Sequence, residues 1–188
     1  MLKEESPAGI SNKKLKPRRI PQHHRSDCFG CSPNNAHGLQ LDFWLSDHGC
    51  YSHCSIPNHF CGFNGLAHGG IIATLLDEVA AWANVVHFQR IAVTMEATVR
   101  YLKPVPTATE LLLEGKIINH QEKHSKVASS IRSMEGEMLA TCESQWLFPS
   151  YAAFAKAAGV DESTLQKLVE QMMEPLKHLL ADSKVQPD

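Results

Sequence analysis

The 188-residue sequence lacks several features that would assign it at once to a class of protein. It has no run of about eighteen apolar residues, which predicts that the chain has no transmembrane helix. The N-terminus contains no apolar core of a secretory signal, so we expect a cytoplasmic location. Neither a P-loop nor a dinucleotide-binding glycine pattern is present, which argues against nucleotide hydrolysis and hydride transfer.

Net charge is also nearly absent, with a formal value of -2 at pH 7. So small a charge creates no global basic field, and we expect neither nucleic acid nor a membrane as a partner. Basic residues gather only near the N-terminus, among prolines and without apolar periodicity. This pattern predicts a flexible basic leader over residues 1–27, followed by the folded part of the chain.

Hydrophobic periodicity predicts one long helix among several strands. The stretch Ile71–Val86 is the most apolar in the chain and contains neither Pro nor Gly, which favours a helix. The strands that follow it have no helices between them, so the order favours an α+β fold in which an antiparallel sheet wraps around the helix. Strands are predicted over residues 39–45, 50–56, 94–103, 111–118, 126–133 and 138–148.

The composition changes after Pro149, where two helical patterns begin. They cover Tyr151–Ala158 and Glu162–Leu180, and the second has an apolar face. Neither carries a catalytic spacing, so we expect a packing or oligomerisation element. The predicted organisation is therefore a leader over 1–27, a domain over 28–149 and a C-terminal helical extension over 150–188.

Asp77 is the most unusual residue of the predicted helix. Thr74, Asp77, Glu78 and Ala81 share one stripe of an otherwise apolar helix, because they are three and four residues apart. Burial of a carboxylate raises its pKa, which suits a general base or nucleophile near neutral pH. The alternative is a carboxylate that only accepts a hydrogen bond at a helix cap or an interface.

Two glycines, Gly69 and Gly70, stand where this helix should begin. Backbone N–H groups at a helix start have no partner inside the helix, and the helix dipole favours negative charge there. This arrangement could form an oxyanion hole for a tetrahedral acyl intermediate. The alternative is a tight turn from strand to helix with no further role.

The segment Gly65–Glu78 resembles the G-x-x-H-G-G-x(6)-D motif of PaaI-type hotdog-fold acyl-CoA thioesterases. The opening segment Cys28–Leu39 and the later Val99–Pro106 also resemble stretches of one bacterial branch of that family. The resemblance covers residues 28 to about 148. It implies the hotdog fold, in which an antiparallel sheet surrounds a central hydrophobic helix.

The resemblance also implies a catalytic role for five residues. Asp77 would activate water or attack the thioester carbonyl. The N–H of Gly69, together with Gly70, would polarise that carbonyl, and His68 would hold the loop and assist. Thr94 matches a residue that orients the water. Because the family's active site lies between two subunits, we expect a homodimer or a dimer of dimers with shared sites.

The chain departs from the family at one position. Many relatives carry Asn or Gln six residues before the motif histidine, where this chain has Gly62, and Asn64 follows two residues later. Either Asn64 substitutes as a substrate-binding residue or the site relies on backbone donors alone.

Glu78 and several cations are further substrate-binding candidates. Glu78 follows the motif aspartate and is expected to support the site. Arg100 and Lys103, at the end of a predicted strand, could bind the phosphates of coenzyme A, as could Lys123 and Lys126. The alternative for each cation is a solvated charge at a strand edge.

Cysteine spacing raises the possibility of a metal. Cys28 and Cys31 have the C-x2-C spacing of zinc ligands, but a zinc ribbon needs a second tight pair, and the remaining candidates straddle a predicted strand. We therefore expect no metal and no cofactor, and no redox role, because no thioredoxin-like pattern surrounds the pair. The residues considered for a second pair of metal ligands are Cys50, His53, Cys54, His59 and Cys61.

The residues and the resemblance together predict a cytoplasmic acyl-CoA thioesterase. The alternative is a non-catalytic acyl-CoA-binding hotdog module that acts as a sensor or scaffold, which Gly62 and the extra helices favour. A hotdog dehydratase or hydratase fits the spacing from His68 to Asp77 less well. The acyl group is not specified, since Phe63, Trp82 and Phe88 could line a pocket or belong to the core.

Overall fold

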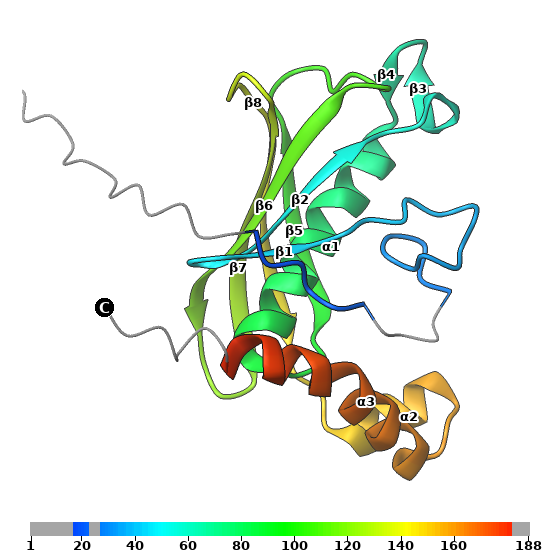
Figure 1. The fold of residues 1–188 in the computed structure, drawn as a ribbon, viewed down its shortest axis with the longest axis vertical. Coiled ribbons are helices and arrows are strands. Elements are labelled where there is room, and N and C mark those ends of the chain that lie inside the picture. The colour runs from blue at the N-terminus through cyan, green and yellow to red at the C-terminus, as the bar shows by residue number, and fades with distance from the viewer. Residues whose placement is uncertain (1–16, 23–26, 182–188) are drawn as a thin grey trace, which may run out of the picture.

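The computed structural model describes residues 17–22 and 27–181. An antiparallel sheet of six strands, in the order β1-β2-β6-β7-β8-β5, packs against one long helix, α1 (Gly69–Phe88) (Figure 1). A separate hairpin precedes the helix. This hairpin contains β3 (Cys61–Phe63) and β4 (Leu66–Ala67) and follows the 3-10 turn η1 (Asn58–Phe60). The strands of the six-stranded sheet are β1 (Trp44–Ser46), β2 (Gly49–Ser55), β5 (Val93–Tyr101), β6 (Glu110–His120), β7 (His124–Ser133) and β8 (Met138–Leu147).

Helix α1 lies between the sheet and the loop of residues 27–41, which we call the N-terminal loop (Figure 1). The helix approaches the sheet closely at Gly115 on β6, where a Cβ atom would lie 2.4 Å from the Val79 carbonyl oxygen. The predicted sheet around a central helix is therefore confirmed. The buried residues of the helix are Ile72, Leu75, Leu76, Val79, Ala80, Trp82, Ala83, Asn84 and Val86.

The length and hydropathy of α1 would also suffice for a membrane span. This test rests on length and composition alone, so the expectation of no transmembrane helix stays a prediction. Core helices of compact domains meet the same test, and α1 packs against five strands of the sheet. Its apolar character is thus explained by its place in the core.

The helix and five of the six predicted strands are confirmed, with ends shifted by a few residues. The exception is 39–45, where only Trp44 and Leu45 belong to a strand. The Leu39 and Leu41 N–H groups donate to the carbonyl oxygens of Phe29 and Gly30, at 2.8 and 3.0 Å. Local pairing within the N-terminal loop thus replaces the sheet ladder.

Part of the predicted leader belongs to the fold. The Ile20 side chain is only 1% exposed, and its N–H donates to the Phe43 carbonyl oxygen at 2.8 Å. The Leu45 N–H donates to the Arg18 carbonyl oxygen at 2.9 Å. The prediction of a flexible leader is therefore wrong for residues 18–20, and residues 1–16 and 23–26 lie outside the described part of the chain.

The two predicted C-terminal helices are confirmed as α2 (Tyr151–Ala158) and α3 (Glu162–Ala181). The Asp161 carboxylate accepts a hydrogen bond from the Thr164 N–H at 3.1 Å, which caps the start of α3. The two helices lie beside the C-terminal end of α1 (Figure 1). They contribute to the main core through Ala155, Leu165, Val169, Met173 and Leu176.

Candidate active site

Asp77 and Thr94 form a hydrogen-bonded pair between α1 and the start of β5. The Thr94 hydroxyl donates to Asp77 Oδ1 over 2.7 Å. Burial raises the pKa of Asp77 above the ordinary value of an aspartate, and the hydrogen bond from Thr94 partly opposes this rise. Asp77 is half-buried and Thr94 is exposed, so the pair lies at the surface of the single chain. The arrangement can hold a carboxylate that is more basic than an ordinary aspartate.

Two residues of the predicted polar stripe have different surroundings. Thr74, Asp77, Glu78 and Ala81 are all half-buried, as the spacing predicts. The Glu78 carboxylate, however, accepts a hydrogen bond from the Cys28 thiol on the N-terminal loop, at 3.4 Å. Glu78 therefore contacts a different part of the molecule from the Asp77–Thr94 pair, and its predicted substrate role has no support from this contact.

His68 caps the start of α1. Its ring Nδ1 accepts a hydrogen bond from the Gly70 N–H at 3.0 Å. In the neutral ring the proton then sits on Nε2, which leaves that atom as a donor. The Gly70 N–H is thus already used, whereas no described residue accepts a hydrogen bond from the Gly69 N–H. Of the two predicted oxyanion donors, only the Gly69 N–H is therefore available, among the described residues, to bind an oxyanion.

Tyr101, at the end of β5, was not predicted as part of this region. Its hydroxyl donates to the Gly69 carbonyl oxygen at 3.1 Å, and its ring lies near Gly69. The alternating pattern of β5 identified Tyr101 only as one member of a strand face. Its position beside the helix start depends on the pairing of β5 with β8.

The two halves of the predicted site are separated within one chain. Asp77 follows Gly69 by eight residues, which is a rise of about 12 Å along the axis of α1. The structure brings Asp77 together with Thr94, and His68 together with Gly70, but not one pair with the other. A site that uses both pairs requires a second chain.

The departure at Gly62 has a steric basis. A Cβ atom at this position would lie 3.2 Å from the Cα of His68, which is tighter than ordinary contact. Asn64 lies two residues away, in the turn between β3 and β4, and Gly65 has the positive φ of 79° that such a turn requires. Asn64 is exposed in this turn, and its role in substrate binding stays a prediction.

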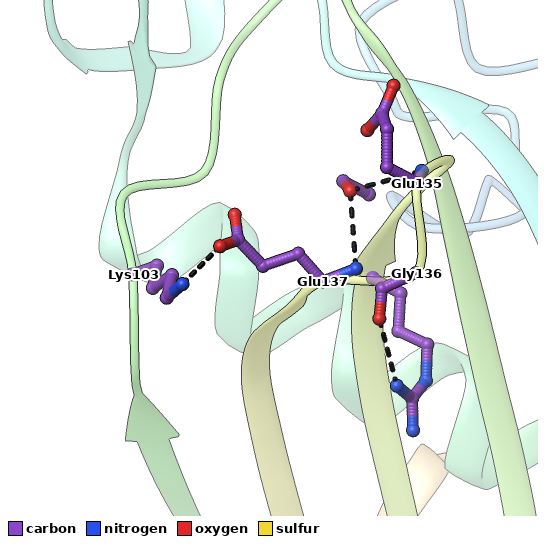
Figure 2. Close-up of polar contacts among 6 residues, drawn as sticks. Lys103, Glu135, Gly136 and Glu137 are labelled. Carbon is purple, nitrogen blue, oxygen red and sulfur yellow. Dashed lines mark hydrogen bonds and ion pairs between the residues drawn. The ribbon is translucent and has the colours of Figure 1, made fainter.

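The predicted phosphate-binding cations lie at the end of β5 and beyond it. Lys103 forms an ion pair with Glu137 on the turn between β7 and β8 (Figure 2). The Ser133 hydroxyl accepts hydrogen bonds from the Glu135 and Glu137 N–H groups, which holds that turn in place. Arg100 is exposed on β5. Both cations are accessible, but a phosphate would compete with Glu137 for Lys103.

The remaining lysine candidates differ from each other. Lys123 is exposed, whereas Lys126 forms an ion pair with Glu143 at 2.6 Å. Both lie near the β6–β7 turn, away from the end of β5 that carries Lys103.

The three aromatic residues considered for an acyl pocket do not gather in one place. Trp82 is buried and stacks on Phe43 with ring centroids 5.3 Å apart. Phe88 packs against Phe148 at 4.8 Å, and Phe63 is 80% exposed on β3. Trp82 is thus a core residue, and these three aromatic side chains define no common pocket within one chain.

Comparisons with known proteins agree with this architecture. The family model of the thioesterase superfamily matches residues 64–140, which include His68, Asp77 and Thr94. A crystal structure of a thioesterase superfamily protein is similar over 64% of this chain, with 26% identity and a TM-score of 0.60, and the match spans 60% of that protein's length. No curated protein is a significant match.

Two further solved structures share the fold. The Escherichia coli PaaI protein from the phenylacetic acid degradation operon is 17% identical over 58% of this chain and 83% of its own, with a TM-score of 0.54. A hypothetical thioesterase protein of Streptococcus pneumoniae, solved with coenzyme A, is 20% identical over 56% of this chain and 82% of its own, with a TM-score of 0.53. The fold and the motif thus define a hotdog domain. The thioesterase superfamily model matches residues 64–140, and the predicted resemblance to PaaI-type proteins is confirmed at the level of the fold.

Proposed function

We propose that this protein hydrolyses acyl-CoA thioesters and that Asp77 is the catalytic carboxylate. The observation that carries the proposal is the 2.7 Å hydrogen bond from Thr94 to a half-buried Asp77. The thioesterase superfamily match over the same residues supports it, as does a streptococcal structure of this fold that was solved with coenzyme A.

Asp77 acts as a general base in this proposal. The ionised carboxylate accepts a proton from a water molecule while the water oxygen attacks the thioester carbon. The carbonyl oxygen becomes an oxyanion, and the tetrahedral intermediate then expels the coenzyme A thiolate, which takes up the proton. Because the Thr94 hydroxyl donates its hydrogen bond to Asp77, its oxygen is left to accept a hydrogen bond from the same water and orient it.

The oxyanion is stabilised at the start of α1. The Gly69 N–H has no acceptor among the described residues, and the positive end of the helix dipole lies at the same point. His68 holds this turn through its bond to Gly70 and offers Nε2 as a second donor. About 12 Å of helix separates these donors from Asp77 in one chain. We therefore propose a homodimer in which each site combines Asp77 of one chain with Gly69 of the other.

Arg100 and Lys103 are the proposed contacts for the phosphates of coenzyme A. Both are exposed, and Lys103 lies near the end of β5, two residues beyond Tyr101, which contacts Gly69. The ion pair between Lys103 and Glu137 opens when a phosphate replaces the carboxylate. Because both groups of that pair are half-exposed, breaking it costs little, on the order of 1 kcal/mol or less.

Release of free thiol from a panel of short, long and aromatic acyl-CoAs tests the proposal. Wild-type protein should turn over at least one class of substrate, and Asp77→Asn should lower kcat by about 10²–10⁴-fold. Asp47→Asn is the matched control, because Asp47 is an exposed aspartate in the β1–β2 turn. Full activity of Asp77→Asn with a folded circular dichroism spectrum would exclude Asp77 as the base.

The second candidate is a non-catalytic acyl-CoA-binding module. Gly62 favours it, because this position lacks the Asn or Gln that contacts the carbonyl or the water in many relatives. In this case acyl-CoA would bind tightly in calorimetry, and no substrate of the panel would release thiol.

A further inference from the structure

Three potential metal ligands meet where the N-terminal loop contacts α1. The Cys28 thiol lies 3.4 Å from Cys31 Sγ and 3.4 Å from Glu78 Oε1. All three ligand atoms lie within 4.8 Å of one another, and this is the one such group of three among the described residues. Cys31 is buried, and Cys28 and Glu78 are half-buried, so the cluster is partly shielded and still reached by solvent.

The backbone of the loop brings these atoms together. The Ser32 N–H donates to the Cys28 carbonyl oxygen at 3.2 Å, which closes a turn around the two cysteines. Gly30 lies inside this turn, and a Cβ there would be 2.2 Å from Cγ of Glu78. The absence of a side chain at Gly30 therefore allows the turn to close directly over the Glu78 carboxylate.

The geometry and the donor atoms fit a thiophilic divalent cation. In a tetrahedral zinc site with Zn–S of about 2.3 Å and Zn–O of about 2.0 Å, ligand atoms are separated by about 3.5–3.8 Å. The two observed distances of 3.4 Å are close to these values, so small movements would admit the ion. Thiolate ligands favour zinc over magnesium or calcium, which prefer oxygen.

We propose that Cys28, Cys31 and Glu78 bind a zinc ion, with a solvent water as the fourth ligand. Each cysteine thiol releases its proton to solvent as its sulfur binds the metal, and the Glu78 carboxylate supplies the oxygen ligand. The ion links the N-terminal loop to the turn of α1 that also carries Asp77. The ion fixes the N-terminal loop against α1, because its ligands come from both segments.

The sequence predicts no metal because a zinc ribbon needs a second tight pair of ligands. The structure places the other candidates elsewhere. Cys50 is fully buried and its thiol donates to the Val79 carbonyl oxygen, and Cys61 is exposed on β3. The third ligand comes instead from Glu78, about fifty residues away in sequence.

Metal analysis of the full chain tests the proposal. The protein is purified under reducing conditions, incubated with zinc, passed through a desalting column and analysed by mass spectrometry for bound metal. We expect about one zinc per chain. Cys28→Ser and Glu78→Gln should each retain less than about a tenth of this amount, and Cys61→Ser, the exposed control, should retain all of it. Circular dichroism confirms that each variant is folded.

Two readouts on the wild-type chain avoid any problem of variant folding. Cobalt in place of zinc should give thiolate-to-metal charge-transfer bands, and zinc should slow alkylation of Cys28 and Cys31, but not of Cys61, by at least tenfold. Absence of retained metal after reconstitution, or equal retention by Glu78→Gln, Cys28→Ser and wild type, would overturn the proposal. Because metal retention is measured without substrate, its outcome is independent of thioesterase activity.

Discussion

The Thr94 hydroxyl donates a 2.7 Å hydrogen bond to the Asp77 carboxylate, which joins the start of β5 to the middle of α1. The bond favours the ionised carboxylate, while burial favours the protonated form and prevails, so that the pKa of Asp77 is raised. The pair therefore holds a carboxylate that is both basic and oriented. This is the property that general-base catalysis needs.

Removal of the Thr94 hydroxyl should lower activity without loss of the fold. Thr94 is exposed, so Thr94→Val leaves the core intact and removes only the donor to Asp77. We expect kcat for thiol release to fall at least about tenfold, with KM little changed. Thr94→Ser keeps a hydroxyl and should retain most of the activity. A valine variant as fast as the serine variant would show that the hydroxyl has no catalytic part.

Asp77→Asn should stabilise the folded protein at neutral pH. Because the pKa of Asp77 is raised in the folded state, its contribution to stability is present at low pH and is lost as the pH rises through that pKa. The neutral amide avoids this loss and can still accept the bond from Thr94. We expect a gain of about 0.5–1 kcal/mol at pH 7 in urea unfolding, and little gain at acid pH. A loss of stability at pH 7 would contradict the raised pKa.

The Gly69 amide can be removed by a single substitution. Gly69 is the first residue of α1, a position where helices accept proline, and His68 before it has the extended ψ of 139° that proline requires. A Cβ at Gly69 meets only Tyr101 atoms at 3.7 Å or more. Gly69→Pro should lower kcat about 10²-fold further than Gly69→Ala, which keeps the N–H. Equal rates for the two variants would exclude this amide as an oxyanion donor.

Sharing of the site between two chains predicts complementation. Asp77→Asn and Gly69→Pro should each be nearly inactive alone. Mixed dimers would contain one site with an intact Asp77 from one chain and an intact Gly69 from the other, so refolding an equal mixture should restore about a quarter of wild-type activity. Native mass spectrometry should demonstrate that mixed dimers form. If they form without any restored activity, the model of a site shared between two chains is excluded.

Local patterns in the sequence predicted much of this structure. The apolar run before Phe88 predicted α1, and alternation predicted β5 to β8, because each pattern reports which side chains face the core. The stripe of Thr74, Asp77, Glu78 and Ala81 is half-buried as its spacing requires. The pairing of Asp77 with Thr94 could be expected only from the family resemblance.

Contacts between distant segments could not be predicted from these patterns. Tyr101 reaches Gly69 because β5 pairs with β8, and Glu78 meets Cys28 because the N-terminal loop folds back over α1. The burial of Ile20 depends on a bridge between residues near it and β1. No periodicity in sequence records such pairings, since each depends on the path of the chain between the two segments.

The pH dependence of kcat/KM for thiol release tests the role of the Asp77–Thr94 pair most directly. The ionised carboxylate is the active form, so kcat/KM should fall as the pH decreases through a midpoint above the ordinary pKa of an aspartate. Thr94→Val removes the hydrogen bond that lowers this pKa, so the midpoint should move to higher pH. An unchanged or lower midpoint in Thr94→Val would contradict Asp77 as the base.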